Sequence, residues 1–212
     1  MTVPIAGPFK VLVVCTGNIC RSPVAERLLA AQFHAAGIPA SVVSGGTRAL
    51  VGHDMTPEAA GLAQSYGADA FGHRSQQLTE ELIADADLVL TATREHRSAV
   101  VSIHPRASRN AYTLNQLARL LPAVVNSSEF QAPPSVPGDA AQPRLDPGSV
   151  LRAFLTEVAA TRGFYPPPVQ SADDDIEDPY RQPAEVYARV GVVINTAVTT
   201  ITDGFATVVR RR

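Results

Sequence analysis

The chain has 212 residues, of which 45% are hydrophobic and 18% charged, and its formal net charge at pH 7 is -2. This length and composition suit one globular domain with a substantial apolar core. A slightly acidic chain lacks the basic excess that nucleic acids and anionic membrane surfaces attract, so we expect neither as a partner.

The cysteine content indicates the redox state of the cellular compartment. The two cysteines, Cys15 and Cys20, are too few for a disulfide scaffold, and this usage is typical of the reducing cytoplasm. The N-terminal residues lack the basic start and long apolar core of a signal peptide, and no stretch reaches about 18 consecutive apolar residues. We therefore predict a cytoplasmic protein without a membrane span.

Strands and helices alternate in the first half of the chain. A buried strand is expected at 9–14, followed by a helix at 24–36 that has Ser22 as its N-cap and ends at Gly37. The same rules predict the next elements: a strand at 41–44, a helix between Thr56 and Gly67, a short helix at 78–84, a strand at 87–91, a helix at 94–103, a weak strand at 111–114 and a short helix at 116–121. This alternation predicts an α/β fold, with a parallel sheet covered by helices on both faces.

The pattern breaks in the second half. Residues 122–147 are rich in Pro, Ser, Gly and Ala, which predicts a loop inserted into a single domain that spans 1–212. A helix is expected at 149–161. A last helix starts near 184 and runs into the 190s, with no turn signal before Asp203-Gly204.

The stretch CTGNICRSP, which directly follows the first strand, carries the chemistry. A strand, a short turn and a helix N-terminus together form an anion site, because the first helical amides lack partners and the helix dipole is positive there. Gly17 and Asn18 tolerate the backbone angles that turn several amides toward one centre. Arg21 adds a planar fork that grips two oxygens of a phosphate-sized anion.

Four roles are open for the two thiols: a disulfide staple, part of a metal site, buried packing and a reactive nucleophile. The five histidines show no ligand spacing, so we expect no metal. The positive surroundings favour the thiolate form of Cys15, and a thiolate beneath a cradled phosphate attacks phosphorus from behind. Ser22 is placed to donate a hydrogen bond to that thiolate. The loop lacks the Lys-Ser/Thr ending of a Walker motif and the glycines of a Rossmann motif.

A nucleophile alone does not complete the reaction, because the leaving oxygen needs a proton from a general acid. Acidic residues cluster at 173–178. Asp178 is the best candidate, since Pro179 fixes the backbone after it and Tyr180 offers an aromatic wall. The same carboxylate can later act as a base for the water that attacks a phosphocysteine.

These residues resemble the signature of the low-molecular-weight protein tyrosine phosphatases, C-x-G-N-x-C-R-S-P, followed much later by Asp-Pro-Tyr. The likeness continues through Ser44-Gly45-Gly46-Thr47 and through His73 with Gln77-Leu78. The resemblance implies a three-layer fold with a four-stranded parallel sheet, a mechanism without metal or cofactor, and a phosphocysteine intermediate. Its implied roles are as follows: Cys15 is the nucleophile, Arg21 binds phosphate, Asp178 is the general acid, Asn18 braces the loop, Ser22 stabilises the thiolate, and Thr16, Gly17, Ile19, Cys20 and Tyr180 complete the substrate pocket.

The chain departs from the family pattern at three places. Ala92-Thr93 stands where many members have Met-Asp, so an acidic group near the site is missing or is replaced by Thr93 or Glu95. Ala49-Leu50 stands where many members carry an aromatic residue on the pocket wall. Residues 122–175 are longer than the usual connection.

Several functions stay open at this level. The leading hypothesis is hydrolysis of phosphotyrosine in proteins and of aryl phosphates, and the family analogy suggests a bacterial-type tyrosine kinase as partner. Thiol-dependent arsenate reduction is a second reading, although no cysteine beyond Cys20 is present for an electron relay. Related arginine phosphatases have a loop that resembles this one but favour Thr at the position of Ile19. A non-catalytic oxyanion-binding module is the fourth reading. Cys20 is either packing or a redox guard of Cys15, and the oligomeric state is open.

Overall fold

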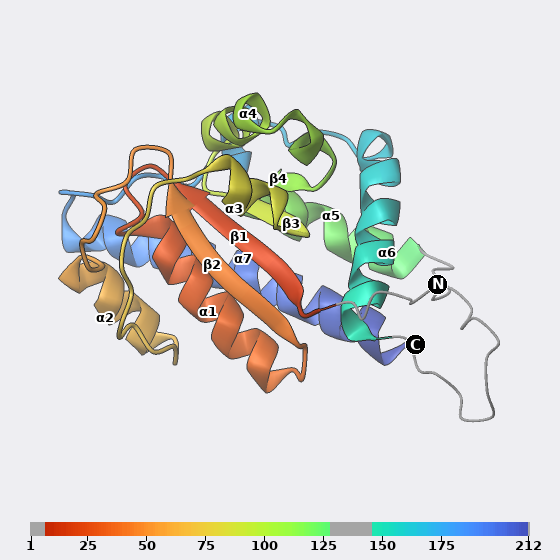
Figure 1. Ribbon diagram of the computed structural model, residues 1–212, viewed down its shortest axis with the longest axis horizontal. Helices are drawn as coiled ribbons and strands as arrows, with labels where there is room; N and C mark the ends of the chain where they lie inside the picture. The colour runs from red at the N-terminus through yellow and green to blue at the C-terminus, as the bar shows by residue number, and fades with distance from the viewer. Residues whose placement is uncertain (1–6, 128–145, 212) are drawn as a thin grey trace.

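The computed structural model describes residues 7–127 and 146–211. Its centre is a four-stranded parallel sheet in the order β2-β1-β3-β4, with helices on both faces (Figure 1). The strands are β1 at Phe9–Cys15, β2 at Ala40–Gly46, β3 at Leu88–Thr91 and β4 at Ala111–Thr113. The expected three-layer α/β fold is therefore confirmed.

Seven α-helices and three 3-10 turns connect and cover these strands within the described residues. The α-helices are α1 at Arg21–Ala35, α2 at Pro57–Ser65, α3 at Glu80–Ala84, α4 at Arg94–Ile103, α5 at Leu114–Ser127, α6 at Pro147–Thr161 and α7 at Ala184–Arg210. The 3-10 turns are η1 at Pro105–Arg109, η2 at Arg162–Phe164 and η3 at Ser171–Asp174.

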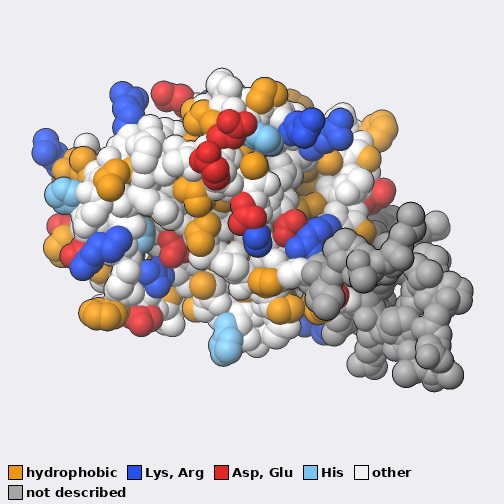
Figure 2. Space-filling model, viewed as in Figure 1, with side chains coloured by type: hydrophobic (Ala, Val, Ile, Leu, Met, Phe, Trp, Pro, Cys, Tyr) orange, Lys and Arg blue, Asp and Glu red, His pale blue; other side chains and the backbone are white. Residues whose placement is uncertain are grey.

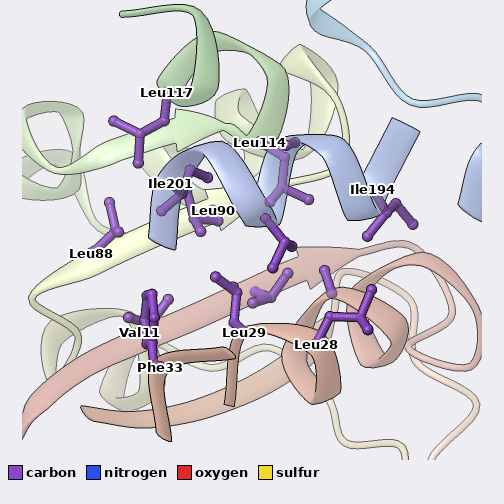
Figure 3. Packing of buried hydrophobic residues seen from close by; sticks show 14 of the residues in the cluster. Val11, Leu28, Leu29, Phe33, Leu88, Leu90, Leu114, Leu117, Ile194 and Ile201 are labelled. Atoms are coloured by element: carbon purple, nitrogen blue, oxygen red, sulfur yellow. The ribbon is translucent and has the colours of Figure 1, made fainter. Parts of the chain in front are cut away.

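The apolar core lies on both faces of the sheet, because alternate residues of β1 point in opposite directions. Phe9, Val11 and Val13 join the larger cluster with α1, α5, α6 and α7, whereas Leu12 and Val14 join a smaller cluster with α3 and α4. Figure 3 shows the larger cluster, in which strand residues meet side chains of three helices: Val11, Leu88 and Leu90 with Leu28, Leu29, Leu114, Ile194 and Ile201. Burial on both faces explains why β1 reads as one continuous apolar run.

The last helix, α7, is long and apolar enough to cross a membrane by length and composition alone, with a mean hydropathy of 1.4 over its best window. Half of that window is buried inside the protein, however. The helix lies beside α1 (Figure 1) and along the larger core cluster. Its Phe205 contacts the rings of Phe9 and Phe33. Packing in the core accounts for its apolar composition.

Three predicted element boundaries were wrong. α5 does not end at 121 but continues through Pro122 to Ser127, because Leu120, Leu121, Val124 and Val125 are buried on one helical face. α7 passes through Asp203-Gly204, since Gly204 packs closely against Leu121 of α5. In both helices tertiary packing outweighs a local breaker. Residues 122–127 of the expected inserted loop are thus helical, and 128–145 lie outside the described residues.

The third wrong boundary is at the start of α1, which begins at Arg21 with Cys20 in the N-cap position and no side-chain cap. Ser22 is therefore not the N-cap that the sequence predicted. It lies inside the first turn, and its hydroxyl is used by the loop in front of the helix.

Charged side chains of both signs are interspersed on the face of the molecule in Figure 2. Among the described residues of that face, no continuous basic surface is visible. The distribution agrees with the small net charge of the chain.

Candidate active site

The loop between β1 and α1 lies at the carboxyl end of the sheet. The strand order changes direction at β1, which has β2 on one side and β3 on the other. This is the position at which open α/β sheets bind ligands. Three carbonyls of the loop are held from outside by the segment after β2: those of Cys15, Thr16 and Gly17 accept hydrogen bonds from the amides of Thr47, Arg48 and Leu50 at 2.9, 3.0 and 3.0 Å.

The amides of the same loop have no such partners. Within the described residues, the backbone N–H groups of 17–20 donate no hydrogen bond, while the carbonyls are directed into neighbouring segments. Asn18, in the run of bends between β1 and α1, adopts the left-handed region with φ of 56°. Successive amides in such a turn form a concave site for an anion.

The buried side chain of Asn18 holds this turn in place. Its Nδ2 donates to Ser22 Oγ at 2.9 Å and to Ser44 Oγ at 2.7 Å, and its Oδ1 accepts from the amide of Gln76 at 2.9 Å. The carbonyl of Asn18 lies 2.8 Å from Nε2 of His73, which must carry the proton because a carbonyl only accepts. The structure thus places Asn18 where the sequence suggested a brace.

Cys15 ends β1 as a buried side chain, with its Sγ 2.9 Å from the hydroxyl of Ser22. That hydroxyl already accepts a hydrogen bond from Asn18. Its own proton is therefore available to the sulfur, and a hydrogen bond of this kind stabilises a thiolate.

Arg21 is almost fully buried beside the loop. Its Nη1 donates to the carbonyl of Ile176 at 3.0 Å, and its Nη2 forms a 2.6 Å ion pair with Asp178. The buried Nε has no hydrogen-bond partner among the described residues. An unpaired buried donor is costly, and a planar guanidinium offers Nε and Nη2 together to two oxygens of one anion.

Asp178 and Tyr180 reach the site from a segment far along the chain. A hydrogen bond from the amide of Ile176 to the carbonyl of Ala92, at 2.8 Å, anchors this segment beside the end of β3. The side chain of Asp178 is 49% exposed, and its Oδ1 accepts from the amide of Tyr180 at 3.2 Å. A half-exposed carboxyl can exchange protons with solvent while it faces the loop.

A pocket of about 180 Å³ opens above the loop. Its lining consists of Cys15, Thr16, Gly17, Ile19, Cys20, Arg21, Arg48, Leu50, Asp178 and Tyr180. All predicted site residues are therefore gathered here except Asn18 and Ser22, which support the loop from behind.

The two cysteines differ in their surroundings, and both are free thiols. Cys20 has its Sγ 3.7 Å from Thr56 Oγ1 and from Tyr187 OH. Burial raises the pKa of the Cys20 thiol. The protonated form that this favours is a poor nucleophile. Cys15 Sγ has a much shorter hydroxyl contact than Cys20 Sγ, 2.9 Å to Ser22 Oγ.

Two site residues were not predicted from the sequence. Arg48 lines the pocket above the loop and also a second cavity of about 240 Å³ next to it, and the buried His96 lines the second cavity. Burial, followed by the charge of Arg21, lowers the pKa of His96 to about 4. Neither residue belongs to a recognisable motif, and among the described residues no group of three His, Cys, Asp or Glu side chains could hold a metal.

Comparison with known proteins agrees with this geometry. Residues 10–128, more than half of the chain, match the model of a family described as low molecular weight phosphotyrosine protein phosphatase. The chain belongs to this family. Family membership makes it a protein-tyrosine phosphatase, which confirms the leading hypothesis from the sequence.

The similar proteins include sequence relatives and solved structures. A probable low molecular weight protein-tyrosine-phosphatase, EpsP of Ralstonia nicotianae, is 38% identical over 50% of this chain and 71% of the relative. The solved structure of a low molecular weight protein tyrosine phosphatase from T. tengcongensis is 26% identical, with a TM-score of 0.62 over 92% of this chain and 98% of the other. YwlE arginine phosphatase from Geobacillus stearothermophilus is also 26% identical, with a TM-score of 0.60 over 92% of both chains.

The lowered pKa of His96 predicts a dependence of stability on pH. Between the ordinary value of 6.5 and about 4, the unfolded chain binds a proton at this histidine and the folded chain does not. Stability is therefore lost as pH falls through this window, by up to about 3 kcal/mol from His96. The nearby charges that act on the ring are Arg21 and Arg48, which oppose protonation, and Asp178 and Asp175, which favour it.

Urea unfolding at pH 7 and pH 4.5 measures this effect. The wild-type chain is expected to lose more stability between the two pH values than the His96→Gln variant, whose amide does not titrate. Equal losses in both proteins would show that His96 titrates normally.

Proposed function

We propose that the chain hydrolyses phosphotyrosine in proteins, and aryl phosphates in general, through a phosphocysteine on Cys15. In the first step the thiolate attacks phosphorus, the bond from phosphorus to the aryl oxygen breaks, and Asp178 gives that oxygen a proton. In the second step Asp178 takes a proton from water. The water oxygen bonds to phosphorus, the bond to sulfur breaks, and inorganic phosphate leaves with the thiolate restored.

The observation that carries this proposal is the convergence of two sets of unsatisfied donors and one thiol on one pocket. The amides of 17–20 and the Nε of Arg21 have no partners among the described residues, and Cys15 Sγ lies at the base of the same loop. A phosphoryl group would satisfy the amides and the guanidinium together. Such preorganised donors stabilise the charge that develops on the phosphoryl oxygens during transfer.

The ion pair between Arg21 and Asp178 fits the order of these events. In the structure the two side chains neutralise each other at 2.6 Å. A bound phosphoryl group competes with Asp178 for the guanidinium. The carboxyl is then free to carry a proton to the leaving oxygen.

The rim of the pocket supports an aromatic substrate. Leu50 and Tyr180 line the pocket and are 40% and 39% exposed, so each offers an apolar surface to a ring. A phosphoprotein is the substrate that follows from the family. A bacterial-type tyrosine kinase as the phosphorylated partner, in the cytoplasm, is the more specific part of the proposal.

The other readings receive less support. The model that matches the chain and the curated relatives carry the tyrosine-phosphatase name, and an arsenate relay has no third cysteine to use. The similarity to an arginine phosphatase structure makes phosphoarginine the competing substrate that an assay has to include.

The substrate class is tested by a panel of peptides. Turnover of phosphotyrosine peptide is expected to exceed that of phosphoserine and phosphoarginine peptides, and Cys15→Ser is expected to lower it by about four orders of magnitude or more. The serine variant should still bind inorganic phosphate, because the amides and Arg21 remain. Undiminished turnover by Cys15→Ser would refute the mechanism, and preference for phosphoarginine would refute the substrate.

The acid role of Asp178 predicts a dependence on the leaving group. Asp178→Asn should slow phenyl phosphate about 100-fold or more and para-nitrophenyl phosphate much less, because nitrophenolate leaves without a proton. Glu177→Gln is the matched control, since Glu177 is exposed and pairs with Arg189 outside the pocket. An equal loss for both substrates in Asp178→Asn would contradict the role.

A further inference from the structure

A line of hydrogen bonds runs from the start of α4 to the phosphate-binding arginine. Thr93, the N-cap of α4, has its Oγ1 2.7 Å from Nδ1 of His96. Nε2 of the same ring lies 2.9 Å from Oγ1 of Thr16, and that hydroxyl accepts from Nη2 of Arg21 at 3.4 Å. The line joins β3, through the helix that follows it, to the loop that follows β1.

His96 is held rigidly in this line. Its side chain is buried, and both ring nitrogens have a hydroxyl partner, so either neutral tautomer uses both nitrogens. The hydroxyl of Thr93 also accepts the amide of His96 at 3.3 Å. The ring position is thus fixed by the cap that starts the helix.

The other supports of Arg21 explain why this line matters. In the structure its guanidinium contacts the carbonyl of Ile176, the carboxylate of Asp178 and the hydroxyl of Thr16. In the proposed reaction Asp178 turns to the leaving oxygen and releases Arg21. Thr16 is then the remaining side-chain support, and its own orientation depends on His96.

We propose that His96 is a positioning residue of this site, which orients the hydroxyl of Thr16 and, through it, the guanidinium of Arg21 for phosphate. The inference rests on the proposed function and adds a residue that carries no catalytic motif. His96 does not touch the reacting atoms; it acts through Thr16.

The role requires a neutral ring. An imidazolium would donate from both nitrogens, so Arg21 and His96 would direct two positive donors at the single oxygen of Thr16. The lowered pKa of His96, caused by burial and by Arg21, agrees with a neutral ring throughout the physiological range.

Two substitutions distinguish the hydrogen bonds made by the two nitrogens of the His96 ring. His96→Gln keeps an amide near the position of Nε2 and hence the contact with Thr16, whereas His96→Asn reaches only the position of Nδ1 and the contact with Thr93. The matched control is His104→Asn, because His104 follows the same helix and contacts the exposed Glu80. Each protein is measured for kcat and KM on para-nitrophenyl phosphate, for calorimetric binding of inorganic phosphate, and for its melting temperature.

We expect His96→Asn to lower kcat/KM and phosphate affinity about tenfold each, the effect of one hydrogen bond to a charged group. His96→Gln should stay within about threefold of the wild type, and His104→Asn should match it. Wild-type behaviour of His96→Asn, or equal losses in the Asn and Gln variants at an unchanged melting temperature, would overturn the proposal.

A double-mutant cycle decides the case if His96→Asn lowers the melting temperature. Combined with Thr16→Val, the His96→Asn change should cost little more phosphate affinity than Thr16→Val alone, because both act through one hydroxyl. Additive losses would refute the role. If the wild type binds phosphate but turns over no aryl phosphate, the proposed function fails, while the phosphate affinities still decide the role of His96.

Discussion

The left-handed turn at Asn18 is the constraint on which the rest of the site depends. A side chain other than glycine adopts this backbone region at a cost, and here the cost is offset by a buried amide group with three hydrogen bonds. The same amide positions Ser22, whose remaining proton faces Cys15. One residue therefore sets the direction of the loop amides and the environment of the thiol at the same time.

The positively charged donors around the loop have too few anionic partners within the described part of the protein. Arg21 is buried with a single carboxylate, that of Asp178, while one of its nitrogens and the loop amides have no partner among the described residues. Taking the carboxylate away from the buried guanidinium is costly unless another anion replaces it. A phosphoryl group meets this condition, so binding and release of the general acid become a single event.

Much of the fold and of the site was predictable from the sequence, because local rules govern both. A β-branched strand followed by a glycine-containing turn and a helix start is a contiguous signal, and Cys15 belongs to it. The passage of α5 through Pro122 was not predictable, since it depends on contacts with distant segments. His96 and Arg48 were missed for the same reason, because only the folded chain brings them to the loop.

The most direct test of the phosphocysteine mechanism is to trap the covalent intermediate. The protein is mixed with excess para-nitrophenyl phosphate, quenched in acid within the first turnover, and digested for peptide mass spectrometry. We predict one phosphoryl group on the peptide that contains Cys15, attached to sulfur and therefore absent after treatment that cleaves phosphorus–sulfur bonds. A phosphoryl group on another residue would contradict this mechanism. A burst of product before the steady state, without any phosphorylated enzyme, would contradict it as well.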